Sequence, residues 1–172
     1  MTQLAFIPPA GISNENDEWY TPSWVFDALG VTFDLDPCSP GVPPSTVPAR
    51  KHLLKADNGL SAKWAGDVWL NPPFSSKREW YERLVEHGNG IALMPNRTET
   101  HDLQDYMRAA DALLFVKGRI YFERGSRPGA NRKGMTTTPP FGIVLCAYNK
   151  RMAKILLASK IHGVRTLTVD HD

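Results

Sequence analysis

The sequence lacks the features by which several classes of protein are recognised. No apolar run approaches the roughly 18 residues of a membrane-spanning helix, and the first nine residues have no basic start of a secretory signal peptide. The chain has only two cysteines, Cys38 and Cys146, which stand far apart and form no CxxC pattern. Its five histidines show no metal-ligand spacing. We therefore expect no disulfide scaffold and no metal site, and we expect a protein of the reducing cytoplasm.

The charge of the chain is nearly balanced in total but not along its length. Hydrophobic residues make up 42% and charged residues 22% of the chain, which excludes wholesale disorder. The formal net charge is only +2, yet residues 117–172 carry 11 basic and 3 acidic side chains. This excess favours contact between the C-terminal third and a polyanion, and the alternative is a set of solvated lysines.

Expected strands and helices alternate along the chain. Strands are predicted at 31–36, 67–70, 91–94, 112–116, 142–148 and 164–169, and helices at 23–29, 76–87, 98–110 and 151–161. In the first helix Ser23 is the expected N-cap and Gly30 the end. Residues 37–50 are rich in proline and are expected to be an irregular crossover. The pattern predicts one α/β domain over residues 1–172, with a mostly parallel sheet and helices on both faces. Residues 1–15 are expected to be a loose lead-in, and 124–140 a basic, mobile loop.

Two motifs directly follow predicted strands, namely Asp36-Pro37-Cys38-Ser39 and Asn71-Pro72-Pro73-Phe74. Ligands of open α/β sheets bind beyond the carboxyl ends of the strands, so both motifs are expected on one rim. In the second motif the two prolines remove two backbone donors, which leaves carbonyl groups and the Asn71 amide oxygen as acceptors beside the ring of Phe74. A flat group with two N–H donors, such as the amine of adenine, would satisfy these acceptors. A rigid turn with a core phenylalanine is the alternative.

The order of motifs resembles the phage-type, or Dam-like, DNA N6-adenine methyltransferase family over roughly residues 17–148. Asn71-Pro72-Pro73-Phe74 is similar to the catalytic motif of amino-methyltransferases, and Phe33 to Ser39 is similar to their cofactor motif. Glu18-Trp19-Tyr20-Thr21-Pro22 is similar to the motif that cradles the methionine part of S-adenosylmethionine. Residues 93–100 and 118–122 complete the series.

The resemblance implies a shortened, Rossmann-like, S-adenosylmethionine-dependent methyltransferase fold. It also implies methyl transfer to the exocyclic amine of an adenine flipped out of double-stranded DNA, by a phage or prophage enzyme in a bacterial cytoplasm. The implied catalytic residues are Asn71, Pro72, Pro73 and Phe74. The expected cofactor-binding residues are Trp19, Tyr20, Thr21, Pro22, Asp36 (for the ammonium group), Pro37, Cys38 and Asp57. The expected DNA-binding residues are Arg97, Arg119, Arg124, Arg127, Arg132 and Lys133.

One departure from the family pattern leaves alternatives open. The usual Gly-x-Gly of the cofactor loop is replaced by Ser39-Pro40-Gly41, and no clear second strand ending in a carboxylate is visible between residues 38 and 66. Asp57 is the best-placed acid for the cofactor's ribose or adenine, and a turn-forming aspartate is an equal alternative. The competing functions are a non-catalytic DNA-binding protein with a degenerate methyltransferase fold, and a methyltransferase that acts on a protein glutamine or an RNA base.

Overall fold

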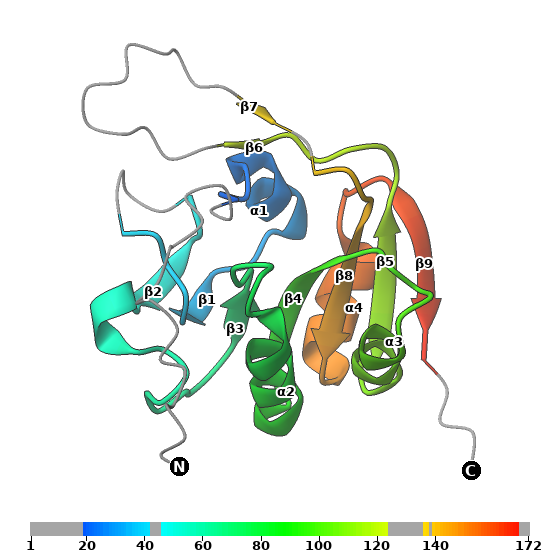
Figure 1. Ribbon diagram of the computed structural model, residues 1–172. Helices are drawn as coiled ribbons and strands as arrows, with labels where there is room; N and C mark the ends of the chain where they lie inside the picture. The colour runs from blue at the N-terminus through cyan, green and yellow to red at the C-terminus, as the bar shows by residue number, and fades with distance from the viewer. Residues whose placement is uncertain (1–18, 42–45, 124–135, 138, 169–172) are drawn as a thin grey trace, which may run out of the picture.

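The computed structural model describes residues 19–41, 46–123, 136–137 and 139–168. Strands and helices alternate along most of this length (Figure 1). The strands are β1 (Phe33–Asp36), β2 (Ala49–His52), β3 (Val68–Leu70), β4 (Gly90–Pro95), β5 (Ala112–Val116), β6 (Phe122–Glu123), β7 (Thr136–Thr137), β8 (Ile143–Tyr148) and β9 (Gly163–Leu167). The helices are α1 (Ser23–Leu29), the short 3₁₀ helix η1 (Lys55–Asp57), α2 (Lys77–His87), α3 (His101–Arg108) and α4 (Lys150–Ala158).

Seven strands form one sheet in the order β2-β1-β3-β4-β8-β5-β9, and β6 and β7 pair separately. Strands β1 to β5 all run in one direction, whereas β8 is antiparallel to both β4 and β5, and β9 is antiparallel to β5. The prediction of a mostly parallel sheet is therefore confirmed for β2, β1, β3 and β4, and it is wrong for the other half of the sheet, where every pair is antiparallel. The described residues contain no helix between β5 and β8 that would return the chain to the opposite end of the sheet. Strand β8 therefore starts at the end where β5 finishes, and it runs antiparallel to β5.

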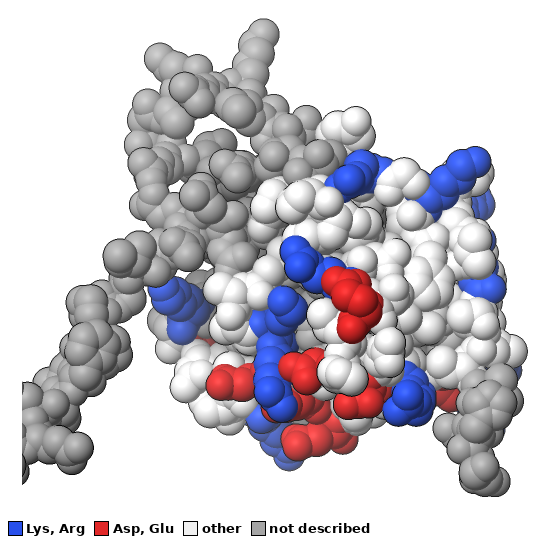
Figure 2. Space-filling view, turned by 45° about the vertical axis from the view of Figure 1, so that its right-hand side comes forward, with Lys and Arg blue, Asp and Glu red and all other residues white. Residues whose placement is uncertain are grey.

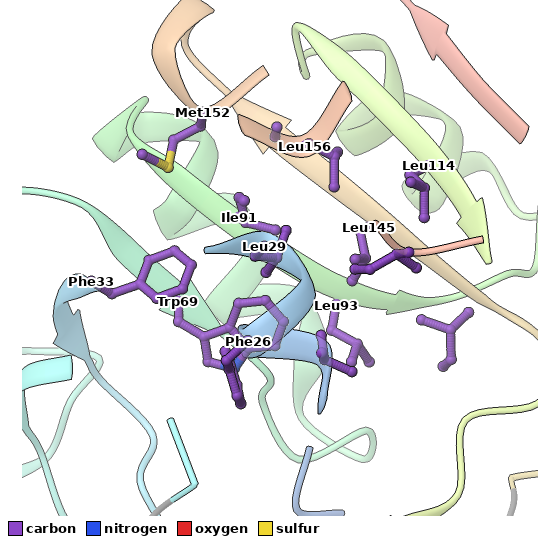
Figure 3. Close-up of a cluster of buried hydrophobic side chains, with 14 of the residues drawn as sticks. Phe26, Leu29, Phe33, Trp69, Ile91, Leu93, Leu114, Leu145, Met152 and Leu156 are labelled. Carbon is purple, nitrogen blue, oxygen red and sulfur yellow. The ribbon is translucent and has the colours of Figure 1, made fainter. Parts of the chain in front are cut away.

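Helices cover both faces of the sheet, which confirms that part of the prediction. Along β4, side chains alternate between two cores, because successive residues of a strand point to opposite faces. Ile91 and Leu93 pack with α1 and α4, whereas Ala92 and Met94 pack with α2 and α3. Figure 3 shows the first of these cores, in which Phe26 and Leu29 of α1 and Met152 and Leu156 of α4 pack with Phe33 and Trp69 of the sheet. No helix in the described ranges is long and apolar enough to cross a membrane.

The predicted helices are present, with differences at their ends. Gly30 ends α1 with a φ of 64°, as expected, but Ser23 is the first helical residue and Pro22 stands at the N-cap position. Helix α3 begins three residues later than predicted. Thr98 lies in the turn that precedes α3, where its carbonyl accepts a hydrogen bond from the Gln104 side chain (2.7 Å).

Strand β2 was not expected. The region 37–50 is not irregular throughout, because Ala49 and Arg50 begin this strand, which pairs in parallel with β1. Its sequence is Ala-Arg-Lys-His, and its residues are half-buried or exposed at the edge of the sheet. An edge strand of this kind has no hydrophobic alternation from which to predict it. It ends at His52, directly opposite Asp36, and not at a carboxylate.

A β-bulge interrupts β1 just before the first motif. The backbone N–H groups of Asp34 and Leu35 both donate to the carbonyl of Asp67, at 2.8 and 3.1 Å. Phe33 consequently packs in the core under α1 and α4, whereas Leu35 packs in the opposite core. Residues two apart in a regular strand share a face, so the bulge changes the direction in which the following Asp36 points.

Candidate active site

The two motifs lie where the strand order reverses. The parallel strands follow the order β2-β1-β3-β4-β5, with β8 inserted between β4 and β5. The chain therefore passes from β2 on one side of β1 to β3 on the other side, and the point of reversal in the sheet lies between β1 and β3. Doubly wound sheets bind ligands at such a point, beyond the carboxyl ends of the strands. Asp36 ends β1, and Asn71 follows β3. The Cys38 thiol donates to the main-chain carbonyl of Asn71 at 3.4 Å, which joins the two motifs directly.

The side-chain amide of Asn71 is held in one orientation by the segment that precedes α1. Its Nδ2 donates to the carbonyl of Trp19 at 2.7 Å and to Thr21 Oγ1 at 3.1 Å. A backbone carbonyl only accepts, so the amide cannot be turned around in this contact. Asn71 Oδ1 is buried and has no hydrogen-bond partner among the described residues. A buried acceptor without a donor costs about 1–3 kcal/mol, and such a group calls for a functional explanation.

The ring of Phe74 lies in an aromatic row. Trp19 stacks on it at 6.3 Å between ring centroids and 27° between planes, and Phe141 meets it at 5.4 Å and 68°. Trp19 also contacts Phe122 edge-on at 5.7 Å. The structure thus places the Trp19 ring against the second motif, whereas the sequence suggested a cofactor contact. Of the two prolines, Pro72 is buried and Pro73 is exposed.

Asp36 is a buried carboxylate with polar partners at the end of β1. It is 2% exposed, and its oxygens lie 3.3 Å from His52 Nδ1 and 3.4 Å from the Cys38 N–H. Burial raises the pKa of the Asp36 carboxyl, and this influence is larger than the lowering of its pKa by His52 and the Cys38 amide. A cationic group placed beside this carboxylate would offset the effect of burial and stabilise its charged form. Burial and the nearby Asp36 charge raise the pKa of the Cys38 thiol, which agrees with its role as a donor.

The remaining residues of the expected cofactor site lie around this carboxylate or farther away. Thr21 and Pro22 are buried and Tyr20 is half-buried. Pro37 is buried, and its carbonyl packs so closely on Gly59 that a Cβ there would stand 1.9 Å from it. Asp57 is exposed, and its carboxylate accepts from the N–H of Leu54 at 2.7 Å. Asp57 therefore stabilises its own turn, and no described contact brings it to the first motif.

Two of the expected DNA-binding arginines are described, and both contact the segment before β8. Arg97 is exposed and lies over the ring of Phe141 at 5.5 Å. Arg119 donates from Nη1 to the carbonyls of Pro139 and Phe141, the latter at 3.1 Å. The other four, Arg124, Arg127, Arg132 and Lys133, lie outside the described residues. In Figure 2 the acidic side chains lie on the lower and middle part of the visible face with basic ones among them, whereas its upper end shows basic ones alone.

A family model described as DNA N-6-adenine-methyltransferase (Dam) matches residues 11–153, which is most of the chain. The chain belongs to this family. No curated protein matches the chain significantly, and neither does any solved structure.

In this member of the methyltransferase family, three site residues were missed by the sequence reasoning. His52 was set aside with the other histidines, although strand β2 places it opposite Asp36. Phe141 and Gly59 contact the two motifs from distant parts of the chain. A predicted β2 would have given a signal for His52, whereas nothing in the sequence pairs Phe141 with Phe74. No group of three or more acidic, histidine or cysteine ligands occurs among the residues described.

Proposed function

We propose that this chain transfers a methyl group from S-adenosylmethionine to the N6 amine of an adenine flipped out of double-stranded DNA. We also infer a Rossmann-like methyltransferase fold, a phage or prophage origin and action in the cytoplasm of a bacterial host. The observation that carries the activity is the fixed Asn71 amide, whose Oδ1 is a buried acceptor with no partner among the described residues. The family match supports adenine N6 as the target, and the reversal of strand order beside β1 supports the fold.

The chemistry needed at the target amine is the release of its lone pair from the ring. An adenine amine is a poor nucleophile because this lone pair is delocalised. An acceptor that draws an N6 hydrogen out of the ring plane leaves the lone pair available for attack. Asn71 Oδ1 is such an acceptor, and its hydrogen bond strengthens as the nitrogen becomes positive in the transition state. Since Trp19 and Thr21 hold the amide, no reorganisation is needed when the base arrives.

Phe74 supplies the flat surface for the base. Base–aromatic stacking contributes about 1–3 kcal/mol per base and tolerates any base, so Phe74 captures the adenine while Asn71 recognises its amine. The Trp19 ring and the Phe141 ring both contact the Phe74 ring and limit its rotation.

The first motif fits the cofactor that the family implies. The bound S-adenosylmethionine would supply an electrophilic methyl group on a sulfonium. Asp36 would hold its ammonium group, because this buried carboxylate is stabilised by a cation. The buried Pro37 and Thr21 would line the same end of the sheet. Asp57, which stabilises its own turn, is a weaker choice for the ribose.

The test is a methylation assay on unmethylated double-stranded DNA, digested to nucleosides and analysed by mass spectrometry. We expect N6-methyldeoxyadenosine with the unaltered chain. Asn71→Ala should lower the rate by about 10²–10³-fold while DNA affinity is retained, as for loss of a group that acts mainly in the transition state. Glu86→Ala, at an exposed position near the C-terminal end of α2 and outside these motifs, is the control and should retain the rate.

The outcomes separate the competing functions. The absence of methylated adenine after long incubation with excess enzyme and cofactor contradicts the proposal. Methyl transfer to RNA or to a protein glutamine, detected in the same way, would assign the activity to another substrate. Failure to bind S-adenosylmethionine in calorimetry, with DNA binding intact, would identify a non-catalytic DNA-binding protein.

A further inference from the structure

The segment that precedes β8 is held beside the aromatic row by hydrogen bonds from an arginine that follows β5. Arg119 lies shortly after β5, and its Nη1 donates to the carbonyls of Pro139 and Phe141. These two carbonyls belong to a segment about twenty residues away in the sequence. Arg119 therefore fixes the backbone of Phe141, whatever side chain that position carries.

The ring of Phe141 lies between the second motif and a second arginine. It meets Phe74 at 5.4 Å with an angle of 68° between the rings, which is the favoured edge-to-face arrangement of aromatic pairs. The guanidinium of Arg97 lies 5.5 Å from the centre of the Phe141 ring. Phe141 is half-buried and packs against the core under α1 and α4.

We propose that Phe141 is a positioning residue of the base site and that Arg119 acts through it. In this arrangement Arg119 sets the backbone of Phe141, and the edge-to-face contact with Phe141 sets the plane of the Phe74 ring on which the target adenine stacks. The inference rests on the proposed function and extends it. It assigns Arg119 to the protein's own carbonyls, in place of the DNA phosphate expected from the sequence.

The two roles for Arg119 predict different measurements. A phosphate contact contributes about 0.9 to the slope of log affinity against log salt, and its loss weakens DNA binding with little effect on the rate at saturating DNA. A positioning role leaves the salt slope unchanged and lowers the rate at saturating DNA. Lys117→Ala is the matched control, because it removes an equal charge from an exposed residue two positions away.

The experiment compares single-turnover methylation at saturating DNA, the salt dependence of DNA affinity, and the fluorescence of 2-aminopurine placed at the target adenine. We expect Arg119→Ala and Phe141→Leu each to lower the saturated rate and the fluorescence increase about 3- to 10-fold, the equivalent of one lost aromatic contact. The double variant should lose no more than the worse single variant, because the two residues act in series. Phe141→Tyr, which keeps the ring, should retain the rate, and thermal unfolding checks that every variant is folded.

Each remaining outcome contradicts the inference. A normal saturated rate for Arg119→Ala with a salt slope lower by about 0.9 makes Arg119 a phosphate contact. Losses that add in the double variant, or an equal loss in Lys117→Ala, exclude action through Phe141. An active unaltered chain with unaffected variants overturns this inference alone, whereas an unaltered chain that methylates no adenine overturns the proposed function as well.

Discussion

Replacing Asn71 with aspartate tests whether the amide orientation is built into the fold. The change keeps the shape of the side chain but exchanges Nδ2 for an oxygen. In the structure Nδ2 donates to the Trp19 carbonyl at 2.7 Å and to Thr21 Oγ1 at 3.1 Å. The Thr21 hydroxyl can turn and donate to a carboxylate, but the Trp19 carbonyl cannot. Asn71→Asp therefore leaves two oxygens facing each other at the distance of a hydrogen bond.

The expected loss follows from these contacts. One hydrogen bond contributes about 0.5–1.5 kcal/mol and an unpaired buried acceptor costs about 1–3 kcal/mol, so the free energy of unfolding should fall by about 2–4 kcal/mol at neutral pH. When protonated, the introduced carboxyl can again donate to Trp19. Its native-state pKa then lies above the unfolded value of about 3.9. The variant should be closest to the unaltered chain below that value and lose stability as the pH rises through the raised pKa.

The assay is urea unfolding between pH 4 and pH 8. Asn96→Asp makes the same chemical change at an exposed position and should stay within about 0.5 kcal/mol of the unaltered chain at each pH. The orientation argument would be refuted if the loss of unfolding free energy in Asn71→Asp did not change with pH, or if it were no larger than the loss in Asn96→Asp.

Three further changes test other parts of the site. Phe74→Ala should weaken DNA binding by about 1–3 kcal/mol in a fluorescence titration, and an unchanged affinity would exclude stacking of a base on this ring. Asp36→Asn should abolish S-adenosylmethionine binding in calorimetry and yet raise the free energy of unfolding at pH 7, because burial raises the pKa of Asp36 in the native state. This gain in the free energy of unfolding should disappear as the pH falls from the raised native-state pKa to the unfolded-state pKa. A gain that persists at lower pH would show that it does not come from removal of the buried charge. Gly59→Ala should lower the free energy of unfolding by about 1–3 kcal/mol, because the new Cβ would stand 1.9 Å from the Pro37 carbonyl. In Gly142→Ala the nearest atom is 3.6 Å away, so equal denaturation midpoints for these two variants would show that the close approach is relaxed at no cost.

The buried elements were predictable because their side chains carry the pattern. Strands β4, β5 and β8 are nearly continuous apolar runs, and Gly30 and Gly88 take the positive φ angles that end α1 and α2. The two motifs follow β1, predicted from its alternating pattern, and the apolar β3, so their place at one end of the sheet followed from the strand assignments. The identity of the family depended on the same motifs.

The polar edge of the sheet could not be predicted in this way. Strand β2 has no buried side chain, and it forms because its backbone pairs with β1 from Phe33 to Asp36. The bulge likewise depends on the backbone alone, because the N–H groups of Asp34 and Leu35 donate to the same carbonyl. Both features decide what surrounds Asp36. The environment of the first motif is therefore set by backbone pairing, which the side-chain pattern of the sequence does not predict.

The proposed base site is held largely by main-chain carbonyl groups, and this explains why the sequence did not show two of its contacts. Trp19 attracted attention for its ring, but its main-chain carbonyl orients the Asn71 amide. Arg119 attracted attention for its charge, but it binds the carbonyls of Pro139 and Phe141. Every residue has a carbonyl, so no residue type marks the ones that accept these bonds. A substitution at Trp19 that removes the ring therefore leaves the Asn71 contact available. Only a change that moves the backbone, or removes the donor itself, would disturb it.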